Sequence, residues 1–434
     1  MTLDVTVIAW AMLGIALYYL GLLILSNRQH AAQGRDLQPW IILIIPAHNE
    51  EMVIAHTIER LASSTYERKL VVVMNDGSTD RTASVAREAG KGRAVRVIDR
   101  APDVAGRGKG AVLNHAFALI MAGEFGPEVS ADDPAQIIVG VMDADGQLDP
   151  DALDAIAPYF ADPRVGAVQI GVRIVNARDG ILQRAQDIEF VGFSGFVQTA
   201  RDRLGSVGLG GNGQFTRLSA LMGTGSEPWS SCLTEDLDLG LTLVEHGWRV
   251  RFCPDVFVAQ QGLDHIRPLL RQRTRWVQGH YQCWRHYPRL LSAPDVPWWT
   301  KLDLSLYLGL LVMVVVFTAN AAISAAQVTG LVHVRDGLLS AIPSDLGQRV
   351  MVEVVSLGPP LCFVSAYQRR AKDPLPWWAV PAATVYFTAY TYLFAVCQVW
   401  AWTRMVLGKG NWAKTQRVLT HASVTPRQPG GEAM

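Results

Sequence analysis

The sequence predicts an α/β domain with a doubly wound sheet, joined to transmembrane helices on both of its sides. Short apolar runs alternate with helical stretches between residues 33 and 279, and long uncharged runs lie before and after that block. Strands that alternate with helices are typical of a parallel sheet covered on both faces. Uncharged runs of about 20 residues are long enough to cross a membrane.

The composition supports membrane segments and disfavours nucleic acid as a partner. Of the 434 residues, 50% are hydrophobic and 18% are charged, below the usual value of about 25%. The 39 Lys and Arg balance the 39 Asp and Glu, which removes the electrostatic case for nucleic-acid binding. We therefore expect no nucleic-acid partner and a shortage of charge concentrated in membrane spans.

The first uncharged run extends from Val5 to Ser26, and only Asp4 precedes it with a charge. A cleaved signal peptide would have a basic start and a small-residue cleavage site, so residues 1–32 are predicted to be a retained anchor. Arg28 and Arg35 follow the run. By the positive-inside rule the block after it is cytoplasmic, at the inner or plasma membrane of the cell.

Further spans are predicted between residues 301 and 403. Leu304–Val334 and Trp377–Trp402 carry no charge, whereas Met351–Tyr367 carries Glu353 and a Pro-Pro pair. The weaker segment could instead be a buried core helix; counting it gives four spans and a multi-pass protein, followed by a tail over residues 404–434. Residues 280–300, with a helix from about His280 to Arg289, are predicted to lie at the membrane interface.

The block from residue 33 to 279 is predicted to be one domain. Four short apolar runs bounded by polar residues indicate buried strands: Ile41–Ile45, Leu70–Met74, Ala94–Ile98 and Ile137–Met142. Helical stretches lie between them, at about Glu50–Ala62, Thr79–Ala89 and Lys109–Ala122. This alternation predicts a parallel, right-handed, doubly wound sheet.

Carboxylates follow three of the predicted strands: Glu50, Asp76, Asp143 and Asp145. In such sheets, ligands bind beyond the carboxyl ends of the strands. A dinucleotide-binding domain would need a GxGxxG turn after the first strand, and the stretch Gly106–Gly110 lacks P-loop spacing. Both of those nucleotide-binding classes are therefore excluded.

Asp143 and Asp145 are two residues apart at the end of a strand. Both can turn toward one hard cation, and Mg²⁺ or Mn²⁺ held by one or two carboxylates usually completes its shell with substrate phosphates. Taken alone, Asp-x-Asp-Gly is more often a polar turn. Its position after an apolar strand favours a site for a metal ion and a diphosphate.

Six short motifs follow one another in the order seen in family 2 glycosyltransferases. They are Pro46-Ala47-His48-Asn49-Glu50, Asn75-Asp76-Gly77-Ser78-Thr79-Asp80, Gly108-Lys109-Gly110 with Asn114, Asp143-Ala144-Asp145, Thr234-Glu235-Asp236 and Gln272-Arg273-Thr274-Arg275-Trp276. The set resembles the membrane-embedded processive branch, which includes cellulose, hyaluronan, chitin-oligosaccharide and poly-N-acetylglucosamine synthases. The resemblance covers roughly Trp40 to Gly279.

This resemblance implies a GT-A fold and a UDP-sugar donor. It implies that the uracil and ribose are held by Pro46, Asn49, Glu50 and Asp76, that Lys109 lies near the diphosphate, and that Asp143 and Asp145 hold the metal. The usual first motif has a tyrosine where this chain has His48, so a stacking role at that position is not carried over. The alternatives are a polar strand end for Glu50, an Asx turn for Asp76 and a solvated helix lysine for Lys109.

Inverting sugar transfer needs one general base for the acceptor hydroxyl, and Asp236 matches the family's base. The alternative is that acidic residues in a first helical turn interact with the helix dipole, a reading kept for Asp238, with Thr234 as the N-cap. The resemblance implies that Gln272, Arg275 and Trp276 lie beside the acceptor and the diphosphate. A basic face near lipid phosphates is the alternative.

A glycine-rich turn at Gly208–Gln214 occupies the place of the family's acceptor-side loop. The five cysteines show no CxxC or metal spacing, and in a reducing compartment they are predicted to be small apolar residues, neither disulfides nor ligands. They are Cys232, Cys253, Cys283, Cys362 and Cys397.

Together these features predict a metal-dependent, inverting hexosyltransferase that extends a β-linked polysaccharide and passes it through its own spans. The expected partners are a UDP-sugar, a glycan or lipid acceptor and membrane lipids; accessory subunits, the sugar and the linkage are not specified by the sequence. The first alternative is a non-processive enzyme that forms a glycolipid. A second, from another class, is a binding or transport protein that has lost catalysis.

Overall fold

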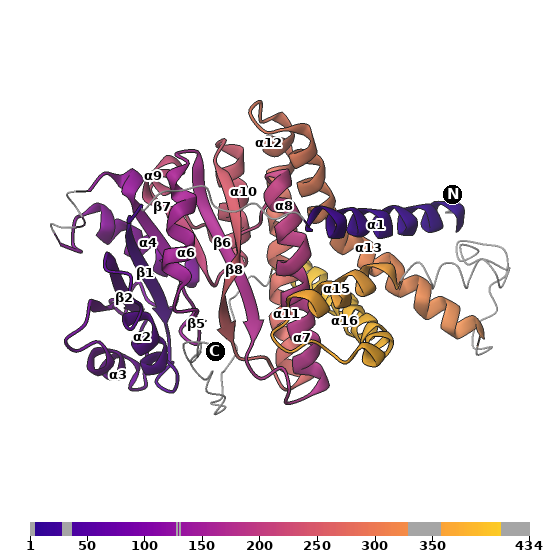
Figure 1. Ribbon diagram of the computed structural model, residues 1–434, viewed down its shortest axis with the longest axis horizontal. Coiled ribbons are helices and arrows are strands. Elements are labelled where there is room, and N and C mark those ends of the chain that lie inside the picture. The colour runs from indigo at the N-terminus through magenta and orange to yellow at the C-terminus, as the bar shows by residue number, and fades with distance from the viewer. Residues whose placement is uncertain (1–4, 28–36, 127–128, 130–131, 329–356, 409–434) are drawn as a thin grey trace, which may run out of the picture.

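The computed structural model describes residues 5–27, 37–126, 129, 132–328 and 357–408. It contains an eight-stranded sheet with helices on both faces, and a group of helices packed at one end of that sheet (Figure 1). The strand order is β3-β2-β1-β4-β7-β6-β8-β5. The substrate-sized cavities lie where the sheet meets the helical group.

The first half of the sheet matches the sequence prediction. It consists of β1 (Trp40–Ala47), β2 (Lys69–Asn75), β3 (Val95–Asp99) and β4 (Ile137–Val141), and all of its pairings are parallel. Ala47 pairs with Asn75 and Ile44 with Val141, so the carboxyl ends of β1, β2 and β4 meet at one edge. β3 was predicted to be buried, but it is an edge strand and only half-buried.

The second half makes the sheet mixed, so the prediction of a fully parallel sheet is wrong. β7 (Gln214–Arg217) runs antiparallel to both β4 and β6 (Val165–Ile174), and β5 (Gln147–Leu148) runs antiparallel to β8 (Arg249–Gln260). β6 and β8 are parallel. The prediction of parallel strands depended on strands that alternate with helices, and β7 instead comes directly after the glycine-rich turn rather than after a crossover helix.

Alternate residues of β1 enter two different cores. Ile42 and Ile44 pack with α4 (Lys109–Met121), α9 (Leu218–Gly223) and α10 (Glu235–Glu245). Ile41, Leu43 and Ile45 pack with the other face, formed by α2 (Ile54–Ala62), α3 (Thr82–Ala89), α6 (Ala152–Ile156) and η2 (Ala157–Ala161). A strand buried on both faces explains the uninterrupted apolar sequence of β1.

The helical end begins with one long irregular helix. It is formed by α7 (Ile181–Gly192), a π-helical segment η3 (Phe193–Gln198) and α8 (Thr199–Leu204). α11 (Ile266–Gln282) is followed by η4 (Cys283–His286) and α12 (Tyr287–Ser292). The prediction of a single helix from His280 to Arg289 is therefore wrong, because α11 ends inside that range and η4 and α12 follow it. Pro288 lies in the first turn of α12, where proline is well tolerated.

Four helices cover most of the described residues of the predicted spans. They are α1 (Val5–Leu25), α13 (Trp298–Val328), α15 (Gly358–Arg370) and α16 (Val380–Val406), the last preceded by η5 (Trp377–Ala379). Pro359 and Pro360 lie in the first turn of α15, where proline is well tolerated. Residues 329–334, 351–356 and 409–434 of the predicted spans and tail lie outside the described residues.

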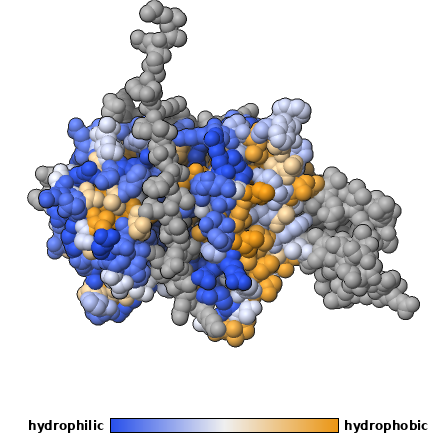
Figure 2. Space-filling view, turned by 90° about the horizontal axis from the view of Figure 1, so that it is seen from below, coloured by the Kyte–Doolittle hydropathy of each residue, from blue (hydrophilic) through white to orange (hydrophobic). Residues whose placement is uncertain are grey.

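One described helix region, Trp377–Val406, is long and apolar enough to cross a membrane, and the apolar stretch Leu13–Leu25 is shorter. Figure 2 shows hydrophobic surface gathered on the helical side of the molecule, whereas the sheet domain is mainly hydrophilic. Trp377 and Trp378, at the start of that helix region, are 84% and 69% exposed. A multi-pass arrangement stays a prediction.

Candidate active site

A cavity of about 370 Å³ lies at the carboxyl ends of β1, β2 and β4. Nearly every residue singled out from the sequence lines it. These are Pro46, Glu50, Asp76, Lys109, Asp143, Asp145, Asp236, Gln272, Arg275 and Trp276. Residues up to 230 positions apart thus line one cavity, which the strand ends and the starts of α4 and α10 form together with α11.

Asn49 is the predicted site residue that the structure does not place on the cavity wall. Its φ of 54° is left-handed, a conformation that asparagine tolerates better than most residues. The side-chain oxygen of Asn49 accepts a hydrogen bond from the backbone N–H of Thr79 at 2.8 Å. The backbone N–H of Asn49 donates to Ser78 Oγ at 3.0 Å. Asn49 thus braces the loops after β1 and β2, which also explains why α2 and α3 begin three or four residues later than predicted.

Asp76 is fixed by two partners at the end of β2. Arg100 forms a buried ion pair with its carboxylate, and the backbone N–H of Gly106 donates to Oδ1 at 3.1 Å. His48 Nδ1 lies 2.7 Å from the Asp76 carbonyl oxygen. Arg100 was missed in the sequence, where it stands two residues after the third predicted strand with no motif around it.

Lys109, the first residue of α4, lies half-buried at the centre of the site. Its Nζ donates to Asp143 Oδ1 at 2.7 Å and to the Gly211 carbonyl oxygen at 2.5 Å. Burial alone would lower the pKa of Lys109, but the carboxylates of Asp143, Glu235 and Asp236 raise it. The ammonium therefore stays charged, which excludes the reading of a solvated helix lysine.

The rest of the Gly-Lys-Gly motif holds the loop that leads to α10. Asn114 Nδ2 donates to the Trp229 carbonyl oxygen at 2.7 Å and its Oδ1 accepts from the Trp229 N–H at 3.0 Å. A Cβ at Gly110 would come within 2.5 Å of the Ser230 carbonyl oxygen. A glycine at that position thus lets the backbone of the loop lie directly on α4.

The donor set at Asp143 and Asp145 suits a hard divalent cation. Both residues line the cavity just beyond β4, and the backbone N–H of Asp143 is held by Asn212 Oδ1 at 3.2 Å. Carboxylate oxygens are the ligands that Mg²⁺ and Mn²⁺ prefer. Lys109 adds a positive charge beside the same carboxylate, as a site for a diphosphate requires.

Asp236 lies in the first turn of α10, facing Lys109 and Gly211. A Cβ on Gly211 would be 3.2 Å from Asp236 Oδ2 and 3.0 Å from Lys109 Nζ, so a side chain there would crowd both groups. Burial raises the pKa of Asp236, and burial with the charge of Asp236 raises the pKa of Glu235 to about 7. A buried carboxylate with a raised pKa is a stronger proton acceptor than an exposed one.

α11 supplies the opposite wall. Arg275 Nη1 donates to the Leu233 carbonyl oxygen at 3.3 Å, just before the Thr234-Glu235-Asp236 motif. Trp276 packs edge-on against Phe190, with ring centroids 6.1 Å apart. The guanidinium of Arg273, a residue with no role predicted from the sequence, lies 4.0 Å from the centroid of the Trp276 ring and so fixes its orientation.

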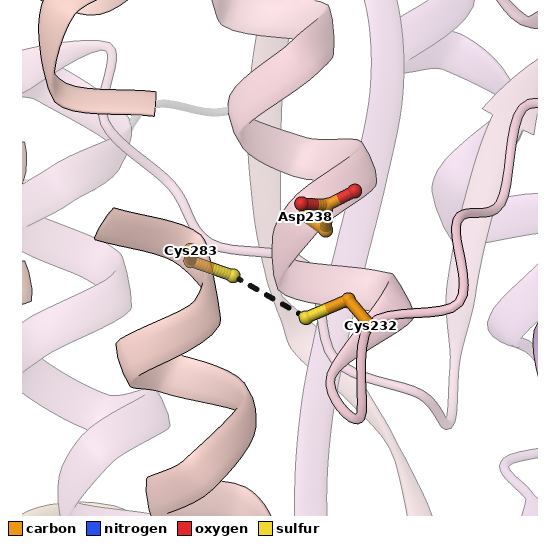
Figure 3. Close-up of side chains that lie close together, drawn as sticks. All are labelled: Cys232, Asp238 and Cys283. Carbon is orange, nitrogen blue, oxygen red and sulfur yellow. Dashed lines mark hydrogen bonds between the residues drawn. The ribbon is translucent and has the colours of Figure 1, made fainter. Parts of the chain in front are cut away.

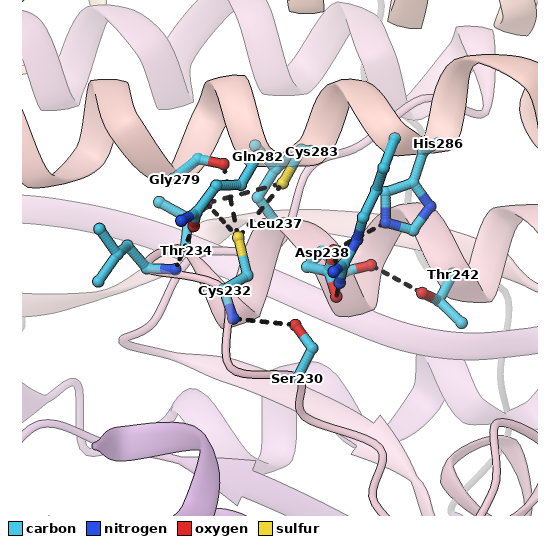
Figure 4. Close-up of polar contacts among 12 residues, drawn as sticks. Ser230, Cys232, Thr234, Leu237, Asp238, Thr242, Gly279, Gln282, Cys283 and His286 are labelled. Atoms are coloured by element: carbon cyan, nitrogen blue, oxygen red, sulfur yellow. Dashed lines mark hydrogen bonds and ion pairs between the residues drawn. The ribbon is translucent and has the colours of Figure 1, made fainter. Parts of the chain in front are cut away.

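Asp238 has partners that the sequence did not predict. Its carboxylate accepts from Arg285 at 2.7 and 2.8 Å and from His286 Nε2 at 2.8 Å, across the contact between α10 and η4 (Figure 4). The helix-dipole reading is therefore incomplete, because these ion pairs hold Asp238. Thr234 does stand at the N-cap of α10, but its side chain makes no capping hydrogen bond.

A second cavity of about 400 Å³ adjoins the first on the side of α1, α13, α15 and α16. Five side chains line both cavities: Phe190, Phe193, Trp276, His280 and Tyr307. The other lining residues are mostly aliphatic or aromatic. Burial lowers the pKa of His280 to about 4, so the shared wall carries no positive charge from this residue at neutral pH.

The glycosyltransferase-like family 2 model matches residues 39–279. Similar curated proteins include a β-monoglucosyldiacylglycerol synthase from Synechocystis (33% identical, 62% of this chain and 54% of that protein). A poly-β-1,6-N-acetyl-D-glucosamine synthase from Staphylococcus aureus is 28% identical over 56% of this chain and 55% of that protein. The matches thus span about half of each of these relatives.

Among solved structures, the chain resembles a mannosyltransferase from Pyrobaculum calidifontis in complex with GDP-mannose and Mn²⁺. The TM-score is 0.59 at 18% identity, over 93% of this chain and 99% of that one. At this identity the likeness supports the fold alone, a GT-A-like domain with a mixed sheet. With a family model that matches more than half of the sequence, the chain belongs to glycosyltransferase family 2, a family of sugar-transferring enzymes.

Proposed function

We propose that this protein transfers a sugar from a UDP-sugar to the hydroxyl group of an uncharged membrane lipid, with inversion at the sugar's anomeric carbon. The main observation is the pair of adjoining cavities, one lined with carboxylates and Lys109 and the other lined mainly with apolar side chains. This reading gives preference to the glycolipid alternative over the polysaccharide expected from the sequence motifs.

The polar cavity is the proposed donor site. Glu50 and Asp76 lie at the β1 and β2 ends, where the nucleoside is expected, and Lys109 lies where it would meet the diphosphate. Asp143 and Asp145 would hold Mg²⁺ or Mn²⁺, which would neutralise charge on the leaving UDP. The Pyrobaculum mannosyltransferase was solved with a nucleotide sugar and Mn²⁺, in line with this assignment.

The apolar cavity is the proposed acceptor site. Among its described lining residues there is one carboxylate, Glu189, and no lysine or arginine. The guanidinium of Arg273 pairs with Glu189 at 2.6 Å and is almost fully buried. A lipid phosphate would meet a carboxylate there without a free cation, so its negative charge is disfavoured. A neutral lipid alcohol fits, as the names of the glucosyldiacylglycerol synthase relatives also suggest.

The proposed reaction takes place at the wall that the two cavities share, formed by Phe190, Phe193, Trp276, His280 and Tyr307. The acceptor hydroxyl enters past Trp276 toward Asp236, which accepts its proton as the oxygen attacks the anomeric carbon. The bond between the sugar and the diphosphate breaks, and Lys109 and Arg275 stabilise the charge on the departing UDP. Apolar side chains on the acceptor side keep water from competing as the nucleophile.

The test is to supply the purified full chain with radiolabelled UDP-glucose and detergent-dispersed acceptors. Diacylglycerol, polyprenyl phosphate and short β-glucans are offered separately, and products are separated by thin-layer chromatography and by size. The expected result is a single-sugar glycolipid from diacylglycerol. Transfer to polyprenyl phosphate, or no transfer to any lipid, would reject the neutral-lipid proposal. Repeating the assay with UDP-N-acetylglucosamine and UDP-galactose identifies the sugar.

The metal has its own test. Asp145→Ala should reduce transfer and weaken UDP-sugar binding, and excess chelator should do the same to the unaltered protein, because both remove the divalent ion from the diphosphate. Added Mn²⁺ should restore the chelated protein but not the variant. Asp151→Ala is the control, since Asp151 is exposed on the same segment. Full activity in excess chelator would exclude a metal-dependent mechanism.

A second candidate is a polysaccharide synthase. The Gln272-Arg273-Thr274-Arg275-Trp276 motif and the similarity to a poly-β-1,6-N-acetyl-D-glucosamine synthase support it. The same assay decides between the two, because a processive enzyme would convert labelled donor into material of high molecular weight without added lipid.

A further inference from the structure

Two of the five cysteines meet beside the catalytic motif, although they lie 51 positions apart. Cys232 is on the loop before α10 and Cys283 follows the last residue of α11, with their sulfur atoms 3.8 Å apart (Figure 3). Both were predicted from the sequence to be small apolar residues, because their spacing along the chain does not reveal this pairing. Neither residue is used in the proposed transfer reaction.

The surroundings hold the two sulfurs in contact. The Leu233 N–H donates to Gln282 Oε1 at 2.9 Å, and Thr234 Oγ1 lies 3.6 Å from one sulfur and 3.7 Å from the other. A Cβ at Gly279 would come within 2.6 Å of the Thr234 backbone nitrogen, so the loop lies directly on α11 (Figure 4). The loop cannot move without disturbing the start of α10.

Asp238 lies near enough for the three residues to resemble a metal site, with ligand atoms within 4.8 Å of one another. Its two oxygens are already bound by Arg285, and Oδ1 also by His286. The carboxylate is therefore committed to these partners. The two thiols are left to react with each other.

The thiols are not equivalent. Cys232 is 8% exposed and Cys283 is fully buried. The hydrogen bond between them stabilises a thiolate on Cys232, which lowers the pKa of Cys232 and raises that of Cys283. Since the thiolate is the nucleophile, Cys232 is the residue that an oxidant would meet first and Cys283 is the one that would resolve the product.

We propose that Cys232 and Cys283 form a reversible disulfide when hydrogen peroxide reaches the site, and that this bond switches sugar transfer off. The Cys232 sulfur attacks peroxide, the O–O bond breaks, and a sulfenic acid and one water form. The Cys283 sulfur then attacks the sulfenic sulfur, the S–O bond breaks, and the disulfide and a second water form. Two thiols lose two electrons and two protons, and the peroxide takes up both.

The expected loss of transfer rate follows from the shorter distance between the two sulfur atoms in a disulfide. The sulfurs must move from 3.8 Å to about 2.05 Å, in a region where Gly279 and Thr234 leave no free space. The strain is passed to Thr234, two residues before Asp236, and to α11, which carries Arg275 and Trp276. A misplacement of about 1 Å between such groups can cost about 100-fold in rate.

The experiment treats the full chain with hydrogen peroxide and then with dithiothreitol. Peptide mapping should find Cys232 linked to Cys283, and the transfer rate should fall about tenfold or more and return after reduction. Cys232→Ser and Cys283→Ala should keep their rates in peroxide, whereas Cys253→Ser, a buried cysteine on β8, should respond like the unaltered protein.

The peptide map needs no assay of sugar transfer, so a failure of the proposed function and a failure of this proposal are distinguishable. A bond between other cysteines, or no bond at all under conditions that oxidise dithiothreitol, overturns the proposal. A Cys232–Cys283 bond that leaves the rate unchanged overturns the switch. If a variant does not fold, the map and the reversal by dithiothreitol in the unaltered protein still decide.

Discussion

The two sides of the candidate active site, the proposed donor side and the proposed acceptor side, are built in different ways. On the donor side, Asp76, Asp143 and the loop after β1 stand at the ends of parallel strands whose register aligns them. On the acceptor side, Glu189, Arg273 and Tyr390 come from three separate helices, α7, α11 and α16, and form one buried polar group.

The difference lies in what positions the chemistry. Strand ends place short motifs by geometry that is common to all such sheets, so motifs that are far apart in the chain meet once the strand register is set, as Asn49 meets Thr79. Helix packing instead places single side chains, and each depends on partners more than 80 residues away, as Arg273 depends on Glu189. The first kind of site can be predicted from local sequence, and the second needs the tertiary structure.

The largest expected effect is at Asp236, the proposed general base, which lies where the two sides meet. Asp236→Asn should lower the transfer rate by about 10²- to 10⁴-fold, because the amide cannot accept the hydroxyl proton, while UDP binding measured by calorimetry stays nearly unchanged. Asp264→Asn, the same change at an exposed carboxylate, is the control. A variant that keeps more than about a tenth of the normal rate would contradict the assignment.

The acceptor side should be more sensitive in stability than the donor side. Arg273→Met leaves the carboxylate of Glu189 without its counter-charge and with Tyr390 as its remaining hydrogen-bond partner, and breaking a buried ion pair from one side costs about 3 to 5 kcal/mol in free energy of unfolding. Thermal melts in detergent would show it as a lower midpoint. Arg271→Met, exposed on the same helix, should change little. Equal midpoints for the two variants would mean that the polar group does not stabilise the helical end.

His286 tests the joint between α10 and η4 through pH. Burial would lower its pKa, but hydrogen bonds to Asp238 and Glu245 raise the pKa of His286 from 6.5 to about 9. A raised pKa means that the stabilisation is fully present below about pH 6.5 and is lost as the pH rises through about 9, by about 3 kcal/mol. Melting midpoints between pH 6 and 10 should fall for the unaltered protein.

The matching variant is His286→Gln, which cannot be charged and should flatten that pH dependence. His246→Gln, an exposed histidine on the same side of the sheet domain, should retain it. An identical slope for His286→Gln would assign the pH dependence to other groups.

The smallest expected effect is at the shared wall. Trp276→Leu removes the flat ring while keeping an apolar side chain, so the acceptor KM should rise about tenfold and the UDP-sugar KM should change little. Trp284→Leu, outside the lining of both cavities, is the control. A selective rise in the donor KM would place Trp276 on the donor side instead.

The sequence predicted residues that the structure brings to one polar cavity, for a physical reason. Lys109, Asp143 and Asp236 belong to motifs whose residue types are demanded by the chemistry, and the structure brings them to one wall. The mixed half of the sheet could not be predicted, because β5 and β7 are two and four residues long and too short to show a period. Arg100 stands in no motif, and Arg273 lies within the Gln272–Trp276 motif but had no role predicted, because the role of each depends on the carboxylate that it meets in the fold.

The five side chains common to both cavities have a thermodynamic consequence. A ligand that packs against one face of Phe190, Phe193, Trp276, His280 and Tyr307 restricts them for the other cavity as well. Binding of the acceptor should then change the affinity for the donor, and by linkage the donor must change the affinity for the acceptor by the same factor. The shared wall would therefore couple the two proposed substrates, and the sign of that coupling sets whether the complex with both bound is favoured or disfavoured relative to the two singly bound complexes.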